Sequence, residues 1–416
     1  MSIGHRMGHI VSAVAGSGLV WLGTAGAAAA QPGNPAYQAF FTAACAGATG
    51  QLAALCAASR GGSLSTDSES SLNPNQTSVA GRTALARAQA LATATERRLE
   101  TLRDEAEGEA AAPAGGAFSV FGSVQGEWSD QDRATFANER GFDADATRLT
   151  IGLDYRLAAT STVGASVTFG DYSSDFDANL PGNAFTPQAD AGGIDADDVT
   201  VTLFATFALS PRAYLDATAG VGFTEYDLRR NATFQESNRL VPQADVRAVA
   251  SPDGREYFGS VGVGYDAEMG ALSLGPYARL RVARSRIDSY TENDGGAGLA
   301  LSVSKAKTTS VVSVLGVRAS YAISQSWGVV LPQARFEYEH EFDDDPRTTT
   351  TSLLLDPARN TFGVRNDPPD RDAFNLGAGL LFVLPNGWMP YVDYEGLLGY
   401  SDTSRHRLTA GIRVEF

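Results

Sequence analysis

Charged residues stand at alternate positions within otherwise apolar stretches of the second half of the sequence. In an extended strand, alternate residues share one face, so these charges would line one side and leave the other side apolar. Their guanidinium and carboxylate groups could form a charged pore wall that holds a polar helix or selects solutes. They could equally pair across strands and fill the interior with hydrogen bonds, and the sequence leaves both interpretations open. The candidate pore-lining residues are Arg148, Arg156, Arg279, Arg281, Arg318, Arg335, Glu337, Glu339, Asp393, Glu395, Arg413 and Glu415.

Residue types that carry enzymatic chemistry are sparse. Two of the histidines lie in the first 30 residues, which leaves His340 and His406 for the rest of the chain. That part also lacks the G-x-S-x-G, P-loop, H-E-x-x-H and C-x-x-C motifs. His340 shares the phase of Phe336 and Tyr338, which favours a position at the rim of the apolar face over a catalytic one. We therefore expect no enzymatic activity, no cofactor and no metal site.

Cys45 and Cys56 are the two cysteines of the chain. In an oxidising, exported compartment we expect them to form a disulfide that closes a small loop. A metal site is the alternative interpretation, but both remaining histidines are far away in the sequence.

The first 30 residues have the pattern of a secretory signal peptide. Residues 5–9 include basic side chains, residues 10–22 are uncharged, and residues 28–30 are three alanines that offer a cleavage site. A transmembrane anchor is the alternative, but the stretch is short and diluted with Gly, Ser and Ala, whereas a bilayer span needs about 20 strongly apolar residues. We expect residues 1–30 to be removed on export.

The exported chain is acidic. Cleavage removes one basic residue, Arg6, from the 32 Lys and Arg that stand against 48 Asp and Glu, so the net charge becomes −17. Such a balance argues against nucleic acid as a partner.

The segment between the signal and the strands is expected to be helical in part. In the N-terminal segment 31–77, residues 37–59 are rich in alanine and predict one or two short helices, while residues 61–77 predict a linker. Residues 78–116 predict a long helix and a second linker, because Ser78 has the character of an N-cap and no proline interrupts residues 79–107. This helix is too polar for a protein core and suits a wet cavity or solvent.

Residues 117–416 change to a period of two. They contain twelve strand candidates, joined alternately by brief turns and by long loops rich in Asp, Asn, Gly and Pro. Short turns on one side and long loops on the other are typical of outer-membrane barrels. The candidates are residues 117–128, 145–157, 162–172, 197–209, 212–226, 255–268, 271–288, 308–322, 327–342, 372–384, 388–398 and 404–416.

The last strand shows the alternation most clearly. Leu408, Ile412 and Phe416 share one face, while Arg413 and Glu415 share the other. A soluble β-sandwich also alternates, but charges opposite the apolar face, loop asymmetry and an even strand count favour a membrane barrel. We predict an all-β membrane protein, a 12-stranded antiparallel transmembrane β-barrel over residues 117–416. Its long loops would be extracellular, its C-terminus periplasmic, and outer-membrane lipid and lipopolysaccharide would surround it.

Three sequence motifs resemble the autotransporter β-domain of type V secretion. They are Ser-Val-Leu-Gly-Val-Arg-Ala-Ser-Tyr at residues 313–321, Phe-Glu-Tyr-Glu-His-Glu-Phe at residues 336–342, and Gly-Ile-Arg-Val-Glu-Phe at residues 411–416. The resemblance covers residues 117–416. It implies a barrel whose lumen holds an α-helix, here within residues 78–116. In this family the last strand ends in Phe and is the signal that the barrel-assembly machinery recognises, so the resemblance implies that Phe416 is part of such a signal.

The resemblance implies a translocator barrel that holds or exports its N-terminal segment through the pore. Residues 31–77 are short beside the passengers usual in the family, so they could be the whole passenger, a plug or a docking piece. Two alternatives remain: a surface adhesin that binds an extracellular ligand through its long loops, and a diffusion porin.

Overall fold

The computed structural model describes residues 34–108, 118–132, 139–158, 161–179, 181, 185–236 and 243–416. Residues 31–416 form one compact unit. The predicted signal peptide, residues 1–30, lies outside the described residues, so it stays a prediction.

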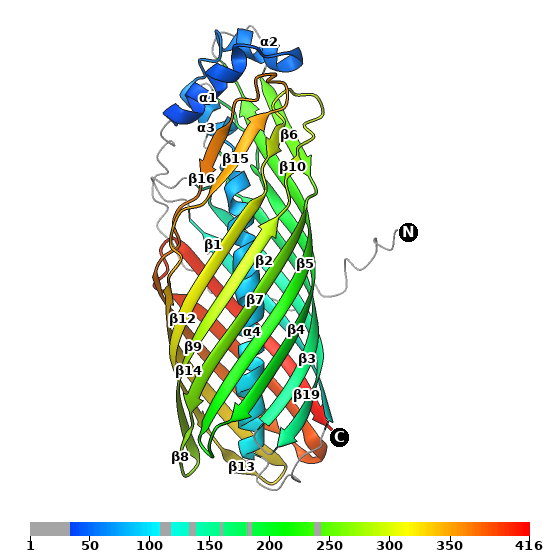
Figure 1. Cartoon of the computed structure of the whole chain (residues 1–416), viewed down its shortest axis with the longest axis vertical. Helices are drawn as coiled ribbons and strands as arrows, with labels where there is room; N and C mark the ends of the chain where they lie inside the picture. Colours follow the sequence, from blue (N-terminus) through cyan, green and yellow to red (C-terminus); the bar gives the residue numbers. More distant parts are fainter. Residues whose placement is uncertain are drawn as a thin grey trace. The chain divides into compact units, whose positions relative to one another are not determined.

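Twelve long antiparallel strands form a closed barrel, as predicted (Figure 1). β1 pairs with β2 on one side and with β19 on the other, and β9 pairs with β12, so the ring of twelve long strands is closed. Closure matters because an open edge would expose unpaired backbone N–H and C=O groups. The strands are β1 (Phe118–Gln131), β2 (Phe142–Ala158), β3 (Ser161–Phe176), β4 (Gly192–Ala208), β5 (Ala213–Phe234), β7 (Asp253–Tyr265), β9 (Leu272–Ile287), β12 (Ala306–Tyr321), β14 (Gly328–Glu341), β17 (Asp372–Val383), β18 (Trp388–Leu398) and β19 (Thr403–Glu415).

The two faces of the strands differ as the alternation predicts. On β2, Ile151 and Leu153 are 52% and 54% exposed on the outer face, whereas Arg148 and Asp154 are buried on the inner face. Apolar side chains therefore cover the outside of the barrel and charges face its interior.

Brief connections join the strands at one end. β8 (Ala267–Met269) pairs with β9, β13 (Ile323–Gln325) pairs with β14, and the 3₁₀ turn η1 (Pro385–Gly387) precedes β18. Gly387 has a φ of 73°, and a Cβ there would lie 2.9 Å from the carbonyl oxygen of Glu415. Only glycine fits this turn without strain.

The long loops at the other end contain regular structure that the sequence analysis did not assign. β5 extends to Phe234 and pairs with β6 (Ala244–Ala250). A separate four-stranded sheet consists of β10 (Tyr290–Thr291), β11 (Leu301–Val303), β15 (Thr348–Leu353) and β16 (Phe362–Arg365). Turn residues dominate the composition of these loops, but short runs such as Thr348–Leu353 are rich in threonine, which favours strands.

Three short helices precede the pore helix: α1 (Pro35–Cys45), α2 (Gly50–Ala58) and α3 (Thr66–Leu72). Asn34 caps α1, because its side chain accepts hydrogen bonds from the N–H groups of Ala36 and Tyr37. The prediction of a linker over residues 61–77 was wrong where it covers α3. Ser65 caps α3 by accepting from the N–H of Ser68, which gives this polar segment a defined start.

The long helix α4 (Gln76–Gly108) lies within the barrel (Figure 1). It begins two residues before the predicted N-cap Ser78, and the predicted linker after it falls mostly outside the described residues. Among the described residues, no helix combines the length and apolar character needed to cross a lipid bilayer.

Candidate functional site

The helix α4 packs against one wall of the barrel interior, formed mainly by β4, β5, β7, β9 and β12. Its few apolar side chains meet apolar residues of that wall: Leu91 belongs to a buried cluster with Phe258 of β7, and Leu99 belongs to one with Phe204 of β4. These apolar contacts involve few side chains. Polar side chains make most of the remaining contacts between α4 and the wall.

Arg97 is the centre of the polar contacts on α4. Its guanidinium donates to Glu337 on β14 at 2.9 Å and to Glu395 on β18 at 2.9 Å. Glu337 is completely buried, and Glu395 is 5% exposed. A buried carboxylate needs such charge-assisted partners, because its desolvation is otherwise costly.

In other ion pairs the arginine is on the barrel wall and the glutamate is on the helix. Arg279 and Arg281 on β9 donate to Glu100 and Glu96 of α4, each at 2.6 Å. Arg318 on β12 donates to the backbone carbonyl of Glu100 at 3.1 Å. Charges on the helix therefore match opposite charges on the wall in both directions.

Further arginines of α4 extend the match along its length. Arg98 donates to Asp154 at 2.9 Å and Arg103 donates to Asp216 at 2.7 Å. Arg87 pairs with Asp198. The helix is thus connected to at least three strands by buried ion pairs.

Other predicted residues pair with one another across the wall. Arg335 donates to Asp393 at 2.6 Å, Arg413 donates to Asp154 at 3.0 Å, and Arg156 donates to Glu415 at 2.6 Å. Arg148 donates to Gln125 at 2.9 Å, and Glu339 accepts from Arg281 at 3.2 Å. The sequence left two interpretations open. Some charged residues of the wall pair with the helix, and others pair with one another across strands, so each interpretation describes part of this interior. A role of these residues in transport stays a prediction.

Several interior residues were missed by the sequence analysis. Asp198, Asp216 and Arg407 share the inner face with the predicted residues, and Asp198 could have been found from the phase of its neighbour Val199. Glu139 and Arg140, after β1, had no periodic signal. Both are buried near the start of α4.

Glu139 and Arg140 connect the β1–β2 loop to the helix. Glu139 accepts from Arg82 of α4 at 2.5 Å, and Arg140 donates to Asn75 at 3.3 Å and to Asn179 at 2.9 Å. Burial raises the pKa of the Glu139 carboxyl, and the Arg82 guanidinium opposes that rise. This loop therefore stabilises the position at which the chain enters the barrel.

Two of the cavities inside the barrel lie beside α4. One, of about 60 Å³, is bounded by residues that include Thr101, Gln125 and Thr150. The other, of about 150 Å³, lies near Arg82, Tyr400 and Arg405. Both linings include polar side chains among apolar ones, and these polar groups offer hydrogen-bond partners for water.

The helices α1 to α3 share a buried apolar core with the strands of the long-loop end. We call α1 to α3 the cap. Phe41, Leu52 and Leu55 of the cap are completely buried, in one cluster with Phe234 of β5 and Leu301 of β11. The cap is therefore folded onto the loops.

Polar contacts fix the cap in register with β5. Ser71 accepts from the N–H of Thr233 at 2.8 Å, and Ser68 accepts from the N–H of Gln235 at 2.9 Å. The Ser68 hydroxyl also donates to the carbonyl of Gln235 at 2.7 Å. The serines of α3 thus satisfy backbone groups of the strand edge.

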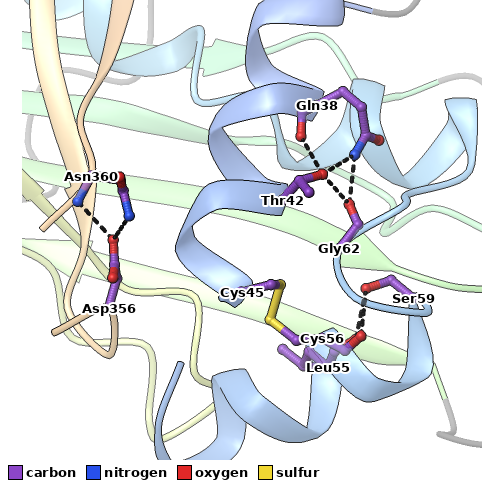
Figure 2. Close-up of a disulfide and its surroundings, with 9 residues drawn as sticks. All are labelled: Gln38, Thr42, Cys45, Leu55, Cys56, Ser59, Gly62, Asp356 and Asn360. Atoms are coloured by element: carbon purple, nitrogen blue, oxygen red, sulfur yellow. Dashed lines mark hydrogen bonds between the residues drawn. A yellow bond between two sulfur atoms is a disulfide. The ribbon is translucent and has the colours of Figure 1, made fainter. Parts of the chain in front are cut away.

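The predicted disulfide between Cys45 and Cys56 is present and joins α1 to α2, with Cα atoms 5.4 Å apart (Figure 2). Beside it, Gln38 of α1 donates to the carbonyl of Gly62 at 2.5 Å and accepts from the N–H of Leu64 at 3.0 Å. Burial raises the pKa of the Glu69 carboxyl in α3.

His340 lies outside the interior. Its Nδ1 is 2.8 Å from a carboxylate oxygen of Asp372, and its ring contacts Phe342. Within the described ranges, no three His, Cys, Asp or Glu side chains gather in a geometry that could hold a metal ion.

The family profile of the autotransporter β-domain matches residues 120–395. The chain belongs to this family. Its β-domains are translocator barrels of Gram-negative outer membranes and are generally not enzymes. A comparison with curated proteins found no match.

The translocator domain of the autotransporter NalP from Neisseria meningitidis has a similar fold. The TM-score is 0.57 at 15% sequence identity, and the alignment covers 80% of this chain and 99% of that chain. The β-domain of the Bordetella autotransporter BrkA gives a TM-score of 0.46 at 18% identity, over 73% of this chain and all (100%) of that one. The transport unit of AIDA-I from Escherichia coli gives 0.44 at 9% identity, over 72% and 90%.

Proposed function

We propose that this autotransporter barrel carries its short N-terminal segment to the cell surface and keeps it there. In this proposal α4 stays in the pore and the cap stays folded on the long-loop end. The product of secretion is then the capped barrel itself, without a released passenger and without an enzymatic step.

The shared core of the cap and the long-loop strands carries this proposal. Full burial of a Leu or Phe side chain stabilises a fold by roughly 1.5 to 3 kcal/mol. Three large side chains of the cap, Phe41, Leu52 and Leu55, are wholly buried in this core. A shared apolar core stabilises the cap in its position on the loops, which is not expected of a segment that only passes through the pore.

The ion pairs of α4 support its retention. Removal of the helix would leave Glu337 and Arg279 without the helical partners that they contact inside the barrel. Loss of one partner from a buried pair costs about 3 to 5 kcal/mol. Retention of α4 avoids this cost at several positions at once.

The proposal includes an orientation and partners. The long-loop end with the cap faces the exterior, and the C-terminus with Phe416 faces the periplasm, where the barrel-assembly machinery would act on it. Outer-membrane lipid and lipopolysaccharide surround the apolar outer face, and nucleic acid is not a partner.

One observation bears on the adhesin alternative. The loops that would bind a ligand are themselves folded into the sheet β10-β11-β15-β16 and share a core with the cap. Any extracellular ligand would therefore meet the outer surface of the cap. A diffusion porin has less support, because α4 and its ion pairs occupy the interior.

Epitope insertion tests the orientation. Gly47, in the exposed turn between α1 and α2, and Gly270, in the exposed turn between β8 and β9, lie at opposite ends of the barrel. An epitope after Gly47 should bind antibody on intact cells, whereas one after Gly270 should bind only after permeabilisation of the outer membrane.

The two insertions control for each other. A Gly47 epitope that stays hidden until permeabilisation would contradict the proposal, as would a Gly47 epitope that is recovered in the culture medium without the barrel.

A further inference from the structure

The outer face of β7, β9 and β12, together with Lys305 just before β12, carries a cluster of cations near the long-loop end. We call it the basic patch: Arg255, Arg284, Arg286, Lys305 and Lys307, all exposed. Arg286 on β9 stands directly opposite Arg255 on β7 and Lys307 on β12. Three cations thus form one row across three neighbouring strands.

Such a row is unfavourable by itself. Side chains directly opposite one another on neighbouring strands have Cβ atoms about 5 Å apart, and like charges at that spacing repel. Asp288 accepts from Arg286 at 2.9 Å and lies 3.9 Å from Lys305. Among the described residues, Arg255, Arg284 and Lys307 have no acidic partner within ion-pair distance. The row therefore has excess positive charge that an anionic ligand would neutralise.

The patch begins where the apolar outer surface ends. On β9 the outward residues run from Leu272 through Leu280 to Val282, and the next two outward positions are Arg284 and Arg286. Ten residues of strand at about 3.3 Å each, tilted about 45°, span roughly 23 Å of membrane thickness. An outer-membrane barrel has an apolar band about 25 Å tall, so the arginines stand at the depth of the lipid headgroups.

Neighbouring aromatic residues indicate the same depth. Tyr257 on β7 stands opposite Arg284 and is 48% exposed. The Arg255 guanidinium lies over the ring of Phe223 on β5, 6.0 Å from its centroid. Exposed aromatic side chains beside cations are typical of the membrane–water interface.

The patch is confined to one sector of the barrel. On β3, β4 and β5 the outward residues near the same end are acidic, with Asp171 opposite Asp197 and Asp197 opposite Glu225. The acidic sector would repel anions. A phosphate group is therefore expected to bind at the basic patch and not over the whole surface of the barrel.

We infer that the basic patch binds the phosphate groups of a membrane lipid in the leaflet at the long-loop end. This rests on the proposed function for the choice of leaflet: with the cap outside, the lipid is the phosphorylated glycolipid of the outer leaflet. Arg255, Arg286 and Lys307 would contact its phosphates, and Leu280 and Val282 would contact its acyl chains.

Lipid binding by the purified full chain in detergent tests this inference. The variant R255Q/R286Q/K307Q removes the row, and the variant R60Q/R212Q/R359Q removes three exposed cations elsewhere. The probe is diphosphorylated lipid A, with dephosphorylated lipid A and inorganic phosphate as comparisons, and the readout is the dissociation constant from native mass spectrometry.

The row variant should bind diphosphorylated lipid A on the order of 100-fold more weakly, since each cation beside an anionic headgroup contributes about a factor of 5. The control variant should bind it like the unaltered protein. Equal binding by the row variant would overturn the inference, as would equal binding of dephosphorylated lipid A by the unaltered protein. Displacement by micromolar inorganic phosphate would overturn it as well, because it would indicate a site for soluble phosphate.

Both variants change exposed outer positions, so their unfolding temperatures in detergent should match that of the unaltered protein. This binding measurement does not depend on which end of the barrel faces outward, and the Gly47 and Gly270 epitopes do not depend on the patch. Failure of the inference and failure of the proposed function are therefore distinguishable.

Discussion

Arg97 of the pore helix and Glu337 of β14 meet inside the barrel, where the guanidinium donates through both terminal nitrogens to a carboxylate with no solvent exposure. The two residues are 240 positions apart in the sequence. Their contact joins the helix that would stay in the pore to the barrel wall.

Replacement of Glu337 by alanine should destabilise the folded protein by about 3 to 5 kcal/mol, because it leaves Arg97 and Arg279 with less neutralising charge in a buried interior. The measurement is the free energy of unfolding by urea in detergent micelles. Glu268→Ala, at an exposed position near the short turn, is the control and should change stability by less than about 0.5 kcal/mol. Equal stabilities of the two variants would show that the pair contributes nothing.

The double variant Arg97→Ala/Glu337→Ala should recover part of that loss, because it removes both charges of the pair. A coupling energy near zero in the double-mutant cycle would contradict a direct interaction.

Loss of the disulfide should loosen the cap and leave the barrel intact. The variant C45A/C56A should lower the stability of the cap by about 2 to 3 kcal/mol, since a disulfide restricts the unfolded chain. Limited proteolysis should cut the variant between α1 and α2 faster than the unaltered protein. The barrel should keep its unfolding temperature, and a barrel that unfolds together with the reduced cap would contradict the separation of the two.

Gly62 and Gly61 offer a matched pair of substitutions. Both have positive φ, 95° and 87°, so alanine strains the backbone at either position by about 1 to 2 kcal/mol. A Cβ on Gly62 would also lie 2.8 Å from the Cα of Thr42 in α1, whereas a Cβ on Gly61 meets nothing within 4 Å. Gly62→Ala should therefore displace α1.

Proteolysis of the cap measures the difference between these variants. Faster cleavage of Gly62→Ala than of Gly61→Ala is the expected result. Identical rates would mean that the contact between α1 and the turn after α2 does not hold the cap closed.

The pore should conduct little while α4 is resident. In planar bilayers the whole chain should give low single-channel conductance, and deletion of residues 31–116 should raise it several-fold because the helix no longer occupies the lumen. A deletion variant with the β-sheet circular dichroism of the parent is the required control. High conductance of the intact chain would favour the diffusion porin.

The barrel could be predicted from the sequence because its signal is local. The alternation of Leu149, Ile151 and Leu153 with Arg148 and Asp154 follows from the period of a strand and needs no knowledge of distant residues. The same phase placed the predicted arginines and acids on the inner face.

The partners of those charges could not be predicted. Arg413 donates to Asp154, a residue 259 positions away, and Arg281 donates to Glu96, 185 positions away. Strand phase assigns a side chain to a face, but the register of the closed barrel and the rotation of α4 decide which charges meet.

The helix α3 of the cap was missed for a physical reason as well. The sequence of α3 is Thr-Asp-Ser-Glu-Ser-Ser-Leu, with Leu72 as its one large apolar residue, and this composition is typical of a linker. It is ordered because Ser68 and Ser71 bond to the backbone of β5 and because Leu72 joins the shared core. Contacts of this kind leave no periodic pattern in the sequence.

Hydrogen–deuterium exchange of the unaltered full-length protein in lipid nanodiscs tests the retention of the N-terminal segment most directly. Backbone amides of α4 between residues 87 and 103, and those of α1 and α2 around Phe41 and Leu55, should exchange as slowly as amides of the barrel strands. Exchange of these amides within seconds, while the strands stay protected, would contradict retention, because it would show that the barrel does not hold the helix and the cap.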